Sequence, residues 1–334
     1  MSLSLLVPTP TASTVYPRVL PERPMRAVLL GCGTVGGGVL DGLRNGFPGD
    51  VTVEAVLVSR HRRGRAPGRF FTEADSVFAT GPRLVIDCLP DGELAERLLE
   101  LALQSGADIV SANKAVIARR PDFAARARER GQILRYSAAV GGELPVLETI
   151  SRIRGEGRAI LSVAGVVNGT SNFVLDRLAE GASLDTAIRA AQALGFAESD
   201  PSADLEGRDA AAKLTLIARA AFGADPDCVS LEAIDAETQE RVREAAACGY
   251  RLRQVATLKA GANGIEASIA LTPRAPGDPL GDVRDEENAV RISCERGDTI
   301  LLTGRGAGRD ATAHSVLSDI GAVIEARCGQ RFGQ

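Results

Sequence analysis

Short apolar runs alternate with longer amphipathic segments through the first part of the chain. Apolar runs of the length of buried strands occur at residues 25–30, 51–58, 84–89 and 109–111. Between the first two runs, Val39, Leu40 and Leu43 show helical spacing, and residues 92–105 form a second amphipathic helix. Because strands and helices alternate, the pattern predicts an α/β fold with a doubly wound parallel sheet.

The pattern beyond residue 136 is less regular. A strand-like segment at residues 159–167 runs into Asn-Gly-Thr at residues 168–170, which marks the exit from a strand into a helix. An amphipathic helix at residues 184–194 ends at Gly195, a typical C-cap. A second, differently built unit is therefore expected after the parallel sheet.

Composition is that of a packed globular protein of about two domains. The chain has 334 residues, of which 45% are hydrophobic and 25% are charged. A net charge of -4 at pH 7 gives no electrostatic reason to expect nucleic-acid or membrane binding, so a small-molecule partner is expected. No apolar stretch reaches the roughly 20 residues of a transmembrane helix. Six scattered cysteines, without metal-binding spacing or a secretory signal, indicate a reducing, cytoplasmic compartment.

Gly31, Gly33 and Gly36 fit the G-x-G-x-x-G pattern between the first strand and the helix that follows. Such glycines permit a tight turn, close backbone approach to a pyrophosphate and close packing of helix on strand. Thr34 and Val35 complete the motif. A Gly-rich turn without a ligand is the alternative, but the strand before the motif and the helix after it favour dinucleotide binding.

The segment after the second predicted strand carries Ser59 and Arg60, and more arginines follow at positions 62 and 63. NAD-binding domains often place an acidic residue here to bind the ribose 2′-hydroxyl. A small polar residue followed by arginines instead suits a 2′-phosphate, so Arg60 favours NADP, with NAD as the second candidate. A solvated basic loop is the alternative, because arginine is common throughout the chain.

Lysine is nearly absent: of 39 Lys and Arg residues, only Lys114, Lys213 and Lys259 are lysines. Arginine does not release its proton near neutral pH, so the lysines are candidates for proton transfer. Lys114 follows Asn113 at the carboxyl end of a predicted strand, where open α/β sheets bind ligands. Exposure of Lys114 to solvent at the strand end is the alternative.

Five carboxylates precede the helix that carries Lys213, namely Glu198, Asp200, Asp204, Glu206 and Asp209. Asp209 stands four residues before Lys213, which places both side chains on one helix face. The helix is apolar beyond this point, so one interpretation is a partly buried lysine whose pKa the carboxylates tune. An acidic helix start with a surface ion pair is the other interpretation, and the spacing alone favours neither.

The region from Ala191 to Lys213 resembles the signature of the homoserine dehydrogenase family in residue type and spacing. The matching residues are Ala191, Gly195, Phe196, Asp200, Pro201, Asp204, Leu205, Gly207, Asp209 and Lys213. Further similar segments follow in order along the chain: G-C-G-T-V-G, N-K-A, V-G-G-E-L-P, V-V-N-G-T-S-N-F and G-R-G-A-G-R-D-A-T-A. The similarity covers about residues 25–325 and is that of the short, catalytic form of the family, without an ACT or a kinase domain.

The resemblance implies an architecture and an activity. It implies a Rossmann dinucleotide-binding domain at residues 25–136 and an α+β substrate and dimerisation domain at residues 137–304. Residues 1–24 are expected to form a flexible extension, and residues 305–334 to return to the nucleotide domain. The implied homodimer interconverts L-homoserine and L-aspartate 4-semialdehyde with NAD(P). A related oxidoreductase for another small amino or oxo acid, or a non-catalytic NADP-binding sensor, is the alternative.

The resemblance also assigns roles to single residues. Lys213 matches the acid/base lysine, and Lys114 matches a lysine near the cofactor and the reacting carbon. The implied substrate-binding residues are Glu198, Asp204, Asp209, Gly169 and Thr170. The implied cofactor-binding residues are Gly31, Gly33, Thr34, Val35, Gly36, Arg60, Lys114 and Gly306.

The chain departs from the family's pattern at two places. Ser137 stands where the family often has a glutamate that helps to bind a monovalent cation, so the cation site loses a formal charge. The implied cation ligands are the carbonyl groups of Val140, Gly142 and Leu144. The second departure is the segment Asp87-Cys88-Leu89-Pro90, where the family commonly has a Thr or Ser after the strand, so a hydroxyl available to the cofactor is missing.

Overall fold

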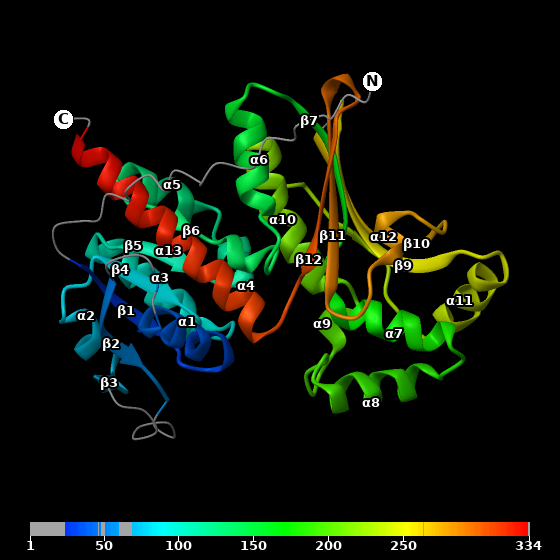
Figure 1. The fold of residues 1–334 in the computed structure, drawn as a ribbon, viewed down its shortest axis with the longest axis horizontal. Coiled ribbons are helices and arrows are strands. Elements are labelled where there is room, and N and C mark those ends of the chain that lie inside the picture. The colour runs from blue at the N-terminus through cyan, green and yellow to red at the C-terminus, as the bar shows by residue number, and fades with distance from the viewer. Residues whose placement is uncertain (1–23, 46, 48–50, 60–68, 263, 333–334) are drawn as a thin grey trace, which may run out of the picture.

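The computed structural model describes residues 24–45, 47, 51–59, 69–262 and 264–332. In this part of the chain the strands form two sheets of six strands each. Figure 1 shows the two sheets side by side, with helices between them and the long C-terminal helix lying across the first sheet. The architecture is mixed α/β, as the sequence predicts.

The first sheet is parallel throughout, in the order β3-β2-β1-β4-β5-β6. Its strands are β1 (Met25–Leu30), β2 (Val51–Leu57), β3 (Phe70–Phe71), β4 (Leu84–Asp87), β5 (Asp108–Ser111) and β6 (Leu134–Arg135). Apolar cores lie on both of its faces, which explains why the middle of each central strand is a continuous apolar run. The predicted doubly wound sheet is confirmed, with a strand at each of the four apolar runs.

Helices cover both faces of the first sheet. They are α1 (Thr34–Arg44), α2 (Ala74–Phe78), α3 (Glu93–Ser105), α4 (Lys114–Arg119), α5 (Asp122–Glu129) and the C-terminal α13 (Arg309–Phe332). Glycines let α13 pack closely on α1, because a Cβ at Gly42 would lie 2.4 Å from Cδ1 of Leu317. The last helix of the chain therefore packs on the first sheet.

The second sheet has the order β12-β11-β7-β9-β10-β8 and is antiparallel except for the short pair β8 and β10. Its strands are β7 (Ile160–Val166), β8 (Ser230–Leu231), β9 (Arg251–Gly261), β10 (Gly264–Arg274), β11 (Glu287–Cys294) and β12 (Thr299–Arg305). The apolar pattern of the sequence predicts the first of these strands and none of the others.

Helices α6 (Val146–Gly155) and α10 (Arg208–Phe222) cover one face of the second sheet. The other elements of this unit are α7 (Gly169–Ala179), α8 (Leu184–Leu194), α9 (Ser202–Leu205), α11 (Thr238–Ala247), α12 (Pro279–Asp282) and the 3-10 turns Ser137–Ala139 and Glu295–Gly297. The predicted end of α8 is confirmed, since Gly195 caps it at φ 81°. Apolar side chains of α6 and α10 join those of both sheets in one continuous core.

Strand β4 is shorter than its apolar run predicts. The run continues to Leu89, but the strand ends at Asp87. The reason is a local turn, because the Asp87 carboxylate accepts a hydrogen bond from the Leu89 N–H at 3.0 Å and turns the chain out of the sheet.

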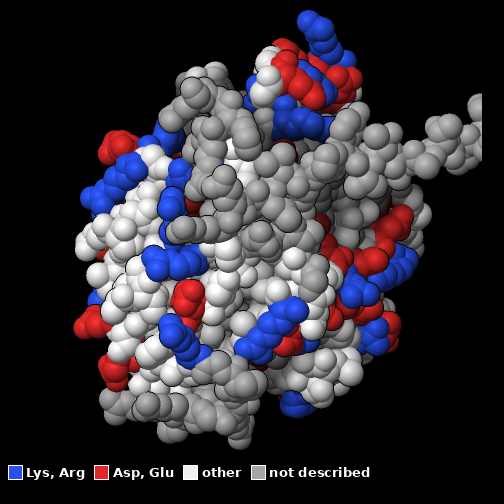
Figure 2. Space-filling model, turned by 60° about the vertical axis from the view of Figure 1, so that its left-hand side comes forward, with Lys and Arg blue, Asp and Glu red and all other residues white. Residues whose placement is uncertain are grey.

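On the face drawn in Figure 2, basic and acidic side chains are interspersed. Many of these charges are paired. For example, Arg120, which caps α4, and Arg126 of α5 pair with carboxylates of α3 and with Asp122. Within the described ranges, every helix lacks either the length or the apolar character that crossing a bilayer requires.

Candidate active site

The loop between β1 and α1 has a geometry that its glycines make possible. Gly31 adopts φ +88°, and a Cβ there would lie 2.8 Å from the carbonyl oxygen of Cys88. A Cβ at Gly36 would lie 2.0 Å from the carbonyl oxygen of Gly31, which leaves no room for a side chain. Gly33, in contrast, is exposed, and a Cβ there would have no neighbour within 4 Å. The loop is thus closed at Gly31 and Gly36 and open at Gly33.

This open backbone fits the pyrophosphate of a dinucleotide. Gly33 is the N-cap of α1 and provides no side-chain capping bond, so the N–H groups at the start of the helix, around Thr34 and Val35, are suited to an anion. Arg60, which the sequence predicts beside a 2′-phosphate, lies outside the described residues.

Two lysines share one carboxylate between the two sheets. Lys114 Nζ lies 2.7 Å from Oδ1 of Asp209, and Lys213 Nζ lies 3.0 Å from Oδ2 of the same residue. Lys213 is 8% exposed and also donates to the Val167 carbonyl oxygen at 2.6 Å. Of the two interpretations of the Asp209–Lys213 spacing, the structure therefore supports the buried pair. Lys114 faces the same carboxylate and keeps 38% of its side-chain surface open.

Local hydrogen bonds place Lys114 at the end of the first sheet. Lys114 is the first residue of α4, and the Asn113 side chain caps this helix by accepting a hydrogen bond from the Val116 N–H at 3.2 Å. The Ser111 hydroxyl accepts the Asn113 N–H at 3.0 Å and donates to the buried Asp87 carboxylate at 2.8 Å. Burial raises the pKa of Asp87 to about 6. The Asp87 carboxylate lies in the segment where the family has a Thr or Ser hydroxyl. Through Ser111 it supports the turn into α4.

Asn168 connects the acidic residues to the lysine cluster, and the sequence analysis missed this role. Its Nδ2 donates to Asp204 Oδ1 at 2.7 Å and to Asp209 Oδ2 at 3.0 Å, while its Oδ1 accepts the Ser171 N–H at 2.8 Å and caps α7. The sequence signal, Asn at the start of a helix, predicts only the cap. The bonds to two carboxylates become visible when α7, α9 and α10 are brought together.

The charges in the cluster stabilise one another. Burial by itself would raise the pKa of Asp209, but the Lys213 and Lys114 ammonium groups outweigh it and hold this pKa well below its usual range. Burial would likewise lower the pKa of Lys114, but the Asp209 carboxylate outweighs it and raises this pKa. Burial is the main cause of a raised pKa at Asp204. At neutral pH, Asp209 is therefore ionised and Lys114 carries its proton.

Two more of the predicted substrate residues lie around this cluster. The Thr170 hydroxyl donates to the Phe196 carbonyl oxygen at 2.6 Å, which ties α7 to the segment that carries Glu198. Glu198 is exposed, and its negative charge contributes to the raised pKa of Lys114. The acidic segment thus borders the lysine cluster on its open side.

The predicted glycines outside the nucleotide loop occupy tight positions. A Cβ at Gly169, the first residue of α7, would lie 3.0 Å from Cα of Glu286. Gly306 lies between β12 and α13, where a Cβ would meet the Asn288 side chain at 1.8 Å. Gly142 adopts φ +60° and packs against the backbone of Gly306. Gly306 therefore lies where the chain leaves β12 of the second sheet and enters α13, which packs on α1.

Ser137 lies between two carboxylates. Its hydroxyl donates to Glu148 and lies 2.9 Å from Asp319 Oδ1, while its N–H donates to Asp319 Oδ2 at 2.8 Å. Arg135 pairs with both carboxylates, at 3.1 Å from Asp319 and 3.5 Å from Glu148. The Leu144 carbonyl already accepts the Val146 N–H at 2.8 Å. The Ser137 hydroxyl, the two carboxylates and the Leu144 carbonyl are thus engaged within the protein.

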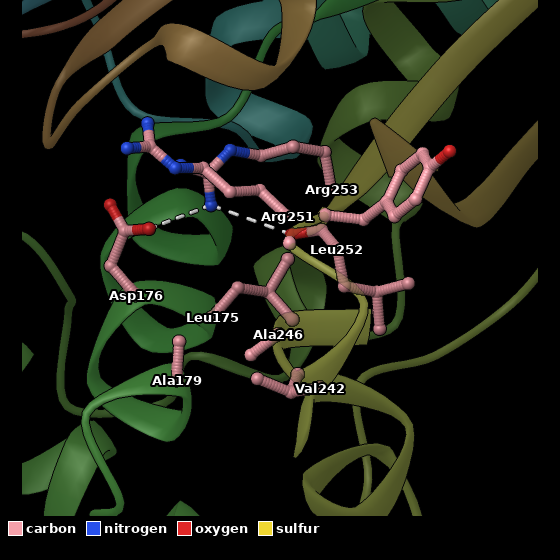
Figure 3. Close-up of a pocket in the computed structure, with 10 residues that line it drawn as sticks. Leu175, Asp176, Ala179, Val242, Ala246, Arg251, Leu252 and Arg253 are labelled. Carbon is pink, nitrogen blue, oxygen red and sulfur yellow. Dashed lines mark hydrogen bonds and ion pairs between the residues drawn. The ribbon is translucent and has the colours of Figure 1, made fainter. Parts of the chain in front are cut away.

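The described residues contain no group of three or more His, Cys, Asp or Glu side chains arranged to hold a metal ion. A cavity of about 250 Å³ lies between α7, β9 and α11 (Figure 3). Arg253 at its wall is 1% exposed and pairs with Asp176 at 2.8 Å, so its buried charge is neutralised within the protein. The residues that line this cavity include none of the predicted site residues.

Two family models match the chain. Residues 31–137 match "Homoserine dehydrogenase, NAD binding domain", and residues 145–320 match "Homoserine dehydrogenase". A homoserine dehydrogenase of Pseudomonas aeruginosa is 34% identical over 320 residues, which are 91% of this chain and 73% of that protein.

Solved structures agree with these matches. A homoserine dehydrogenase from Thiobacillus denitrificans superposes with a TM-score of 0.86 at 31% identity, covering 92% of this chain and 74% of that one. A hyperthermophilic archaeal homoserine dehydrogenase mutant in complex with NADPH superposes with a TM-score of 0.75 at 23% identity, covering 89% of this chain and 96% of that one. The second likeness concerns the fold alone.

Proposed function

Because the chain belongs to the homoserine dehydrogenase family of NAD(P)-dependent oxidoreductases, we propose that Lys114, Asp209 and Lys213 form its catalytic centre. The reaction interconverts the CH–OH group of L-homoserine and the aldehyde of L-aspartate 4-semialdehyde. The observation that carries the assignment is that both lysines contact one carboxylate whose side chain is only 11% exposed, each through a different oxygen. The matched families and relatives give no support to a sensor or to another oxidoreductase.

The proton is the part of the reaction that these side chains supply. The nicotinamide cofactor, when bound, provides or accepts the hydride. Lys213 gives a proton to the alkoxide oxygen as the aldehyde is reduced, and accepts it in the reverse direction. Val167 and Asp209 hold its Nζ in place for this transfer. Lys114, which keeps its proton, stabilises the negative charge that develops on the same oxygen.

The amino-acid end of the substrate is assigned to the residues around the cluster. Asp204 and Glu198 provide negative charge for its ammonium group, with Asp209 as the link to the lysines. Gly169 and Thr170 open α7, where backbone N–H groups favour the substrate carboxylate. The opposite charges of the substrate are thus bound on two sides of the reacting carbon.

The cofactor is assigned to the first sheet. Gly31, Gly33 and Gly36, with Thr34 and Val35, would hold its pyrophosphate, and Gly306 approaches from the C-terminal segment. Arg60 is the reason to propose a preference for NADP over NAD, and an archaeal relative of the same fold holds NADPH. The nucleotide domain is assigned to residues 25–136, the substrate domain to residues 137–304 and the returning segment to residues 305–334.

A homodimer is assigned to the second sheet. One register row across this sheet consists of Leu301, Arg291, Ala164, Thr257 and Ser268, and none of these is fully buried within the chain. Leu301 and Leu161, on the same sheet, are 42% and 48% exposed. A second copy that covers this face would bury both leucines. Light scattering should show a dimer for the wild type and a monomer when both leucines are replaced by glutamate.

A cytoplasmic setting agrees with the cysteines. None of the six, all of which lie in the described residues, forms a disulfide, and Cys228 and Cys248 are exposed. Exposed thiols that remain unpaired are typical of a reducing compartment.

The cation site is proposed to be weak, with the carbonyls of Val140, Gly142 and Leu144 as its ligands. Ser137 supplies no charge, and Arg135 balances the carboxylates beside it. Replacing Na⁺ by a bulky organic cation should therefore leave turnover nearly unchanged.

The direct test of the proposed function measures oxidation of NADPH and of NADH with L-aspartate 4-semialdehyde, and identifies the product against L-homoserine. Folded protein that oxidises neither cofactor with this aldehyde would overturn the assignment. Turnover of a different oxo acid, without turnover of the semialdehyde, would overturn the substrate.

A further inference from the structure

Helix α4, which begins with Lys114, is held in place by contacts from another part of the fold. It spans only Lys114–Arg119, a length at which a helix has little stability of its own in water. Figure 1 shows α4 beside α10, between the two sheets. Helix α4 follows a strand of the first sheet, whereas α10 packs on the second, so contacts between them join the two units.

Arg219 of α10 binds the carboxyl end of α4. Its Nη1 donates to the Ile117 carbonyl oxygen at 2.6 Å, and its Nη2 donates to that of Ala118. Asp225 holds the guanidinium in turn, accepting from Nη2 at 2.8 Å. The last carbonyls of a helix have no partners within the helix and carry partial negative charge, so a cation there stabilises the helix end.

The opposite end of α4 is bound to the same helix. Lys114 Nζ contacts Asp209 in the first turn of α10. That contact alone would fix the Lys114 ammonium poorly, because the lysine side chain has four rotatable bonds and is partly exposed. Arg219 supplies the second attachment, since it sets the position of the backbone from which the Lys114 side chain extends.

We propose that Arg219 is a positioning residue that holds Lys114 at its working distance from Lys213. The inference rests on the proposed function, in which Lys114 stabilises charge on the substrate oxygen. Arg219 itself touches neither predicted substrate residues nor the glycine loop, and it acts through α4. Loss of its bonds would let α4 shift relative to α10 and would separate two groups that must act on one oxygen atom.

The test compares Arg219→Ala with Arg154→Ala. Arg154 of α6 is a matched control. Its guanidinium also donates to a backbone carbonyl oxygen, that of Ala220 at 2.8 Å, but it makes this bond to α10 and not to α4. Arg219→Ala should lower kcat and kcat/KM for the semialdehyde at least about tenfold, and Arg154→Ala should change them less than about twofold. Equal activity of the two variants would overturn the proposal.

A double-mutant cycle separates positioning from general stability. In a Lys114→Ala background, Arg219→Ala should lower kcat further by less than about twofold, because the residue through which it acts is gone. A full additional loss there would show that Arg219 acts in another way and would overturn the proposal. Arg219→Lys keeps the charge but not the contacts to both carbonyl oxygens, so its kcat should lie between those of the wild type and Arg219→Ala. This variant takes the place of Arg219→Ala if the alanine variant does not fold. Wild-type protein without turnover would overturn the proposed function instead, independently of Arg219.

Discussion

The glycine loop and the lysine cluster are two sites built in opposite ways. The loop consists of consecutive residues from Gly31 to Gly36, and its shape depends on the absence of a side chain at Gly31 and at Gly36. The cluster takes Lys114 from α4 and Asp209 and Lys213 from α10, and it depends on the presence of charges. Adding one methyl group disrupts the loop, whereas removing one amine disrupts the cluster.

This difference indicates which property each region controls. A change in the loop should weaken cofactor binding and leave the proton-transfer groups in place. A change in the cluster should reduce turnover and leave cofactor binding nearly intact. Measuring NADPH affinity and kcat on the same variants therefore tests whether the two regions are as separate as their construction suggests.

The largest effect is expected at Lys213. Lys213→Arg keeps the positive charge beside Asp209 but does not supply a proton at neutral pH, so kcat should fall by roughly 10² to 10⁴-fold. NADPH affinity, measured by fluorescence titration, should change little. Lys259→Arg on the exposed part of β9 is the control and should be silent. Retention of more than about a tenth of kcat by Lys213→Arg would contradict proton transfer by this residue.

The second effect tests the loop. An alanine Cβ at position 36 would lie 2.0 Å from the Gly31 carbonyl oxygen, so the backbone must move. Gly36→Ala should weaken NADPH binding by roughly 100-fold and destabilise the fold by about 1 to 3 kcal/mol. Gly37→Ala is a matched control in the same helix, since a Cβ there meets nothing within 4 Å. If both variants bound NADPH equally well, the close contact would not govern the cofactor site.

The third effect concerns Asp87, a buried charge below the loop. Its folded-state pKa is about 6 against a usual 3.8, so folding favours the protonated form, and stability is lost as pH rises between these values. The free energy of unfolding should fall by up to about 3 kcal/mol over this pH range. Asp87→Asn removes this dependence, so urea unfolding should show the variant gaining on the wild type from pH 4 to pH 6 and not beyond.

A control with the opposite sign accompanies this measurement. The hydrogen bond from Arg119 lowers the pKa of Asp91, so its contribution to stability is present at neutral pH and is lost on acidification. Because Asp91 is half exposed, the Asp91→Asn variant should change stability by less than about 1 kcal/mol. Parallel pH curves for Asp87→Asn and the wild type would show that the Asp87 charge is not penalised.

Sequence alone predicted those features whose interactions are local. The loop motif and the end of α8 at Gly195 depend on neighbours a few residues away. Asn168 was missed because its carboxylate partners lie 36 and 41 residues further on, and Arg219 because its contact with Ile117 spans 102. The strands of the second sheet after β7 were missed for another reason. Most of them pair with the next strand along the chain, β9 with β10 and β11 with β12, but charged and polar residues interrupt their apolar positions. The lysine roles required the family resemblance, because spacing alone left a surface pair open.

The last prediction tests whether the cofactor site is as free of side chains as its loop suggests. In the proposed binding mode the loop would contact the pyrophosphate through backbone groups. NAD and NADP have the same pyrophosphate, so this contact would offer no basis for choosing between them. Selection must then come from a charge near the ribose, and Arg60 is the candidate that the sequence supplies. Arg60→Ala should weaken NADP binding by about 1 to 3 kcal/mol, the range for a charge-assisted hydrogen bond, and hardly change NAD binding. Titration of both cofactors against wild type and variant measures this difference. Equal losses for NADP and NAD would mean that Arg60 does not recognise the 2′-phosphate, and that discrimination lies in another residue.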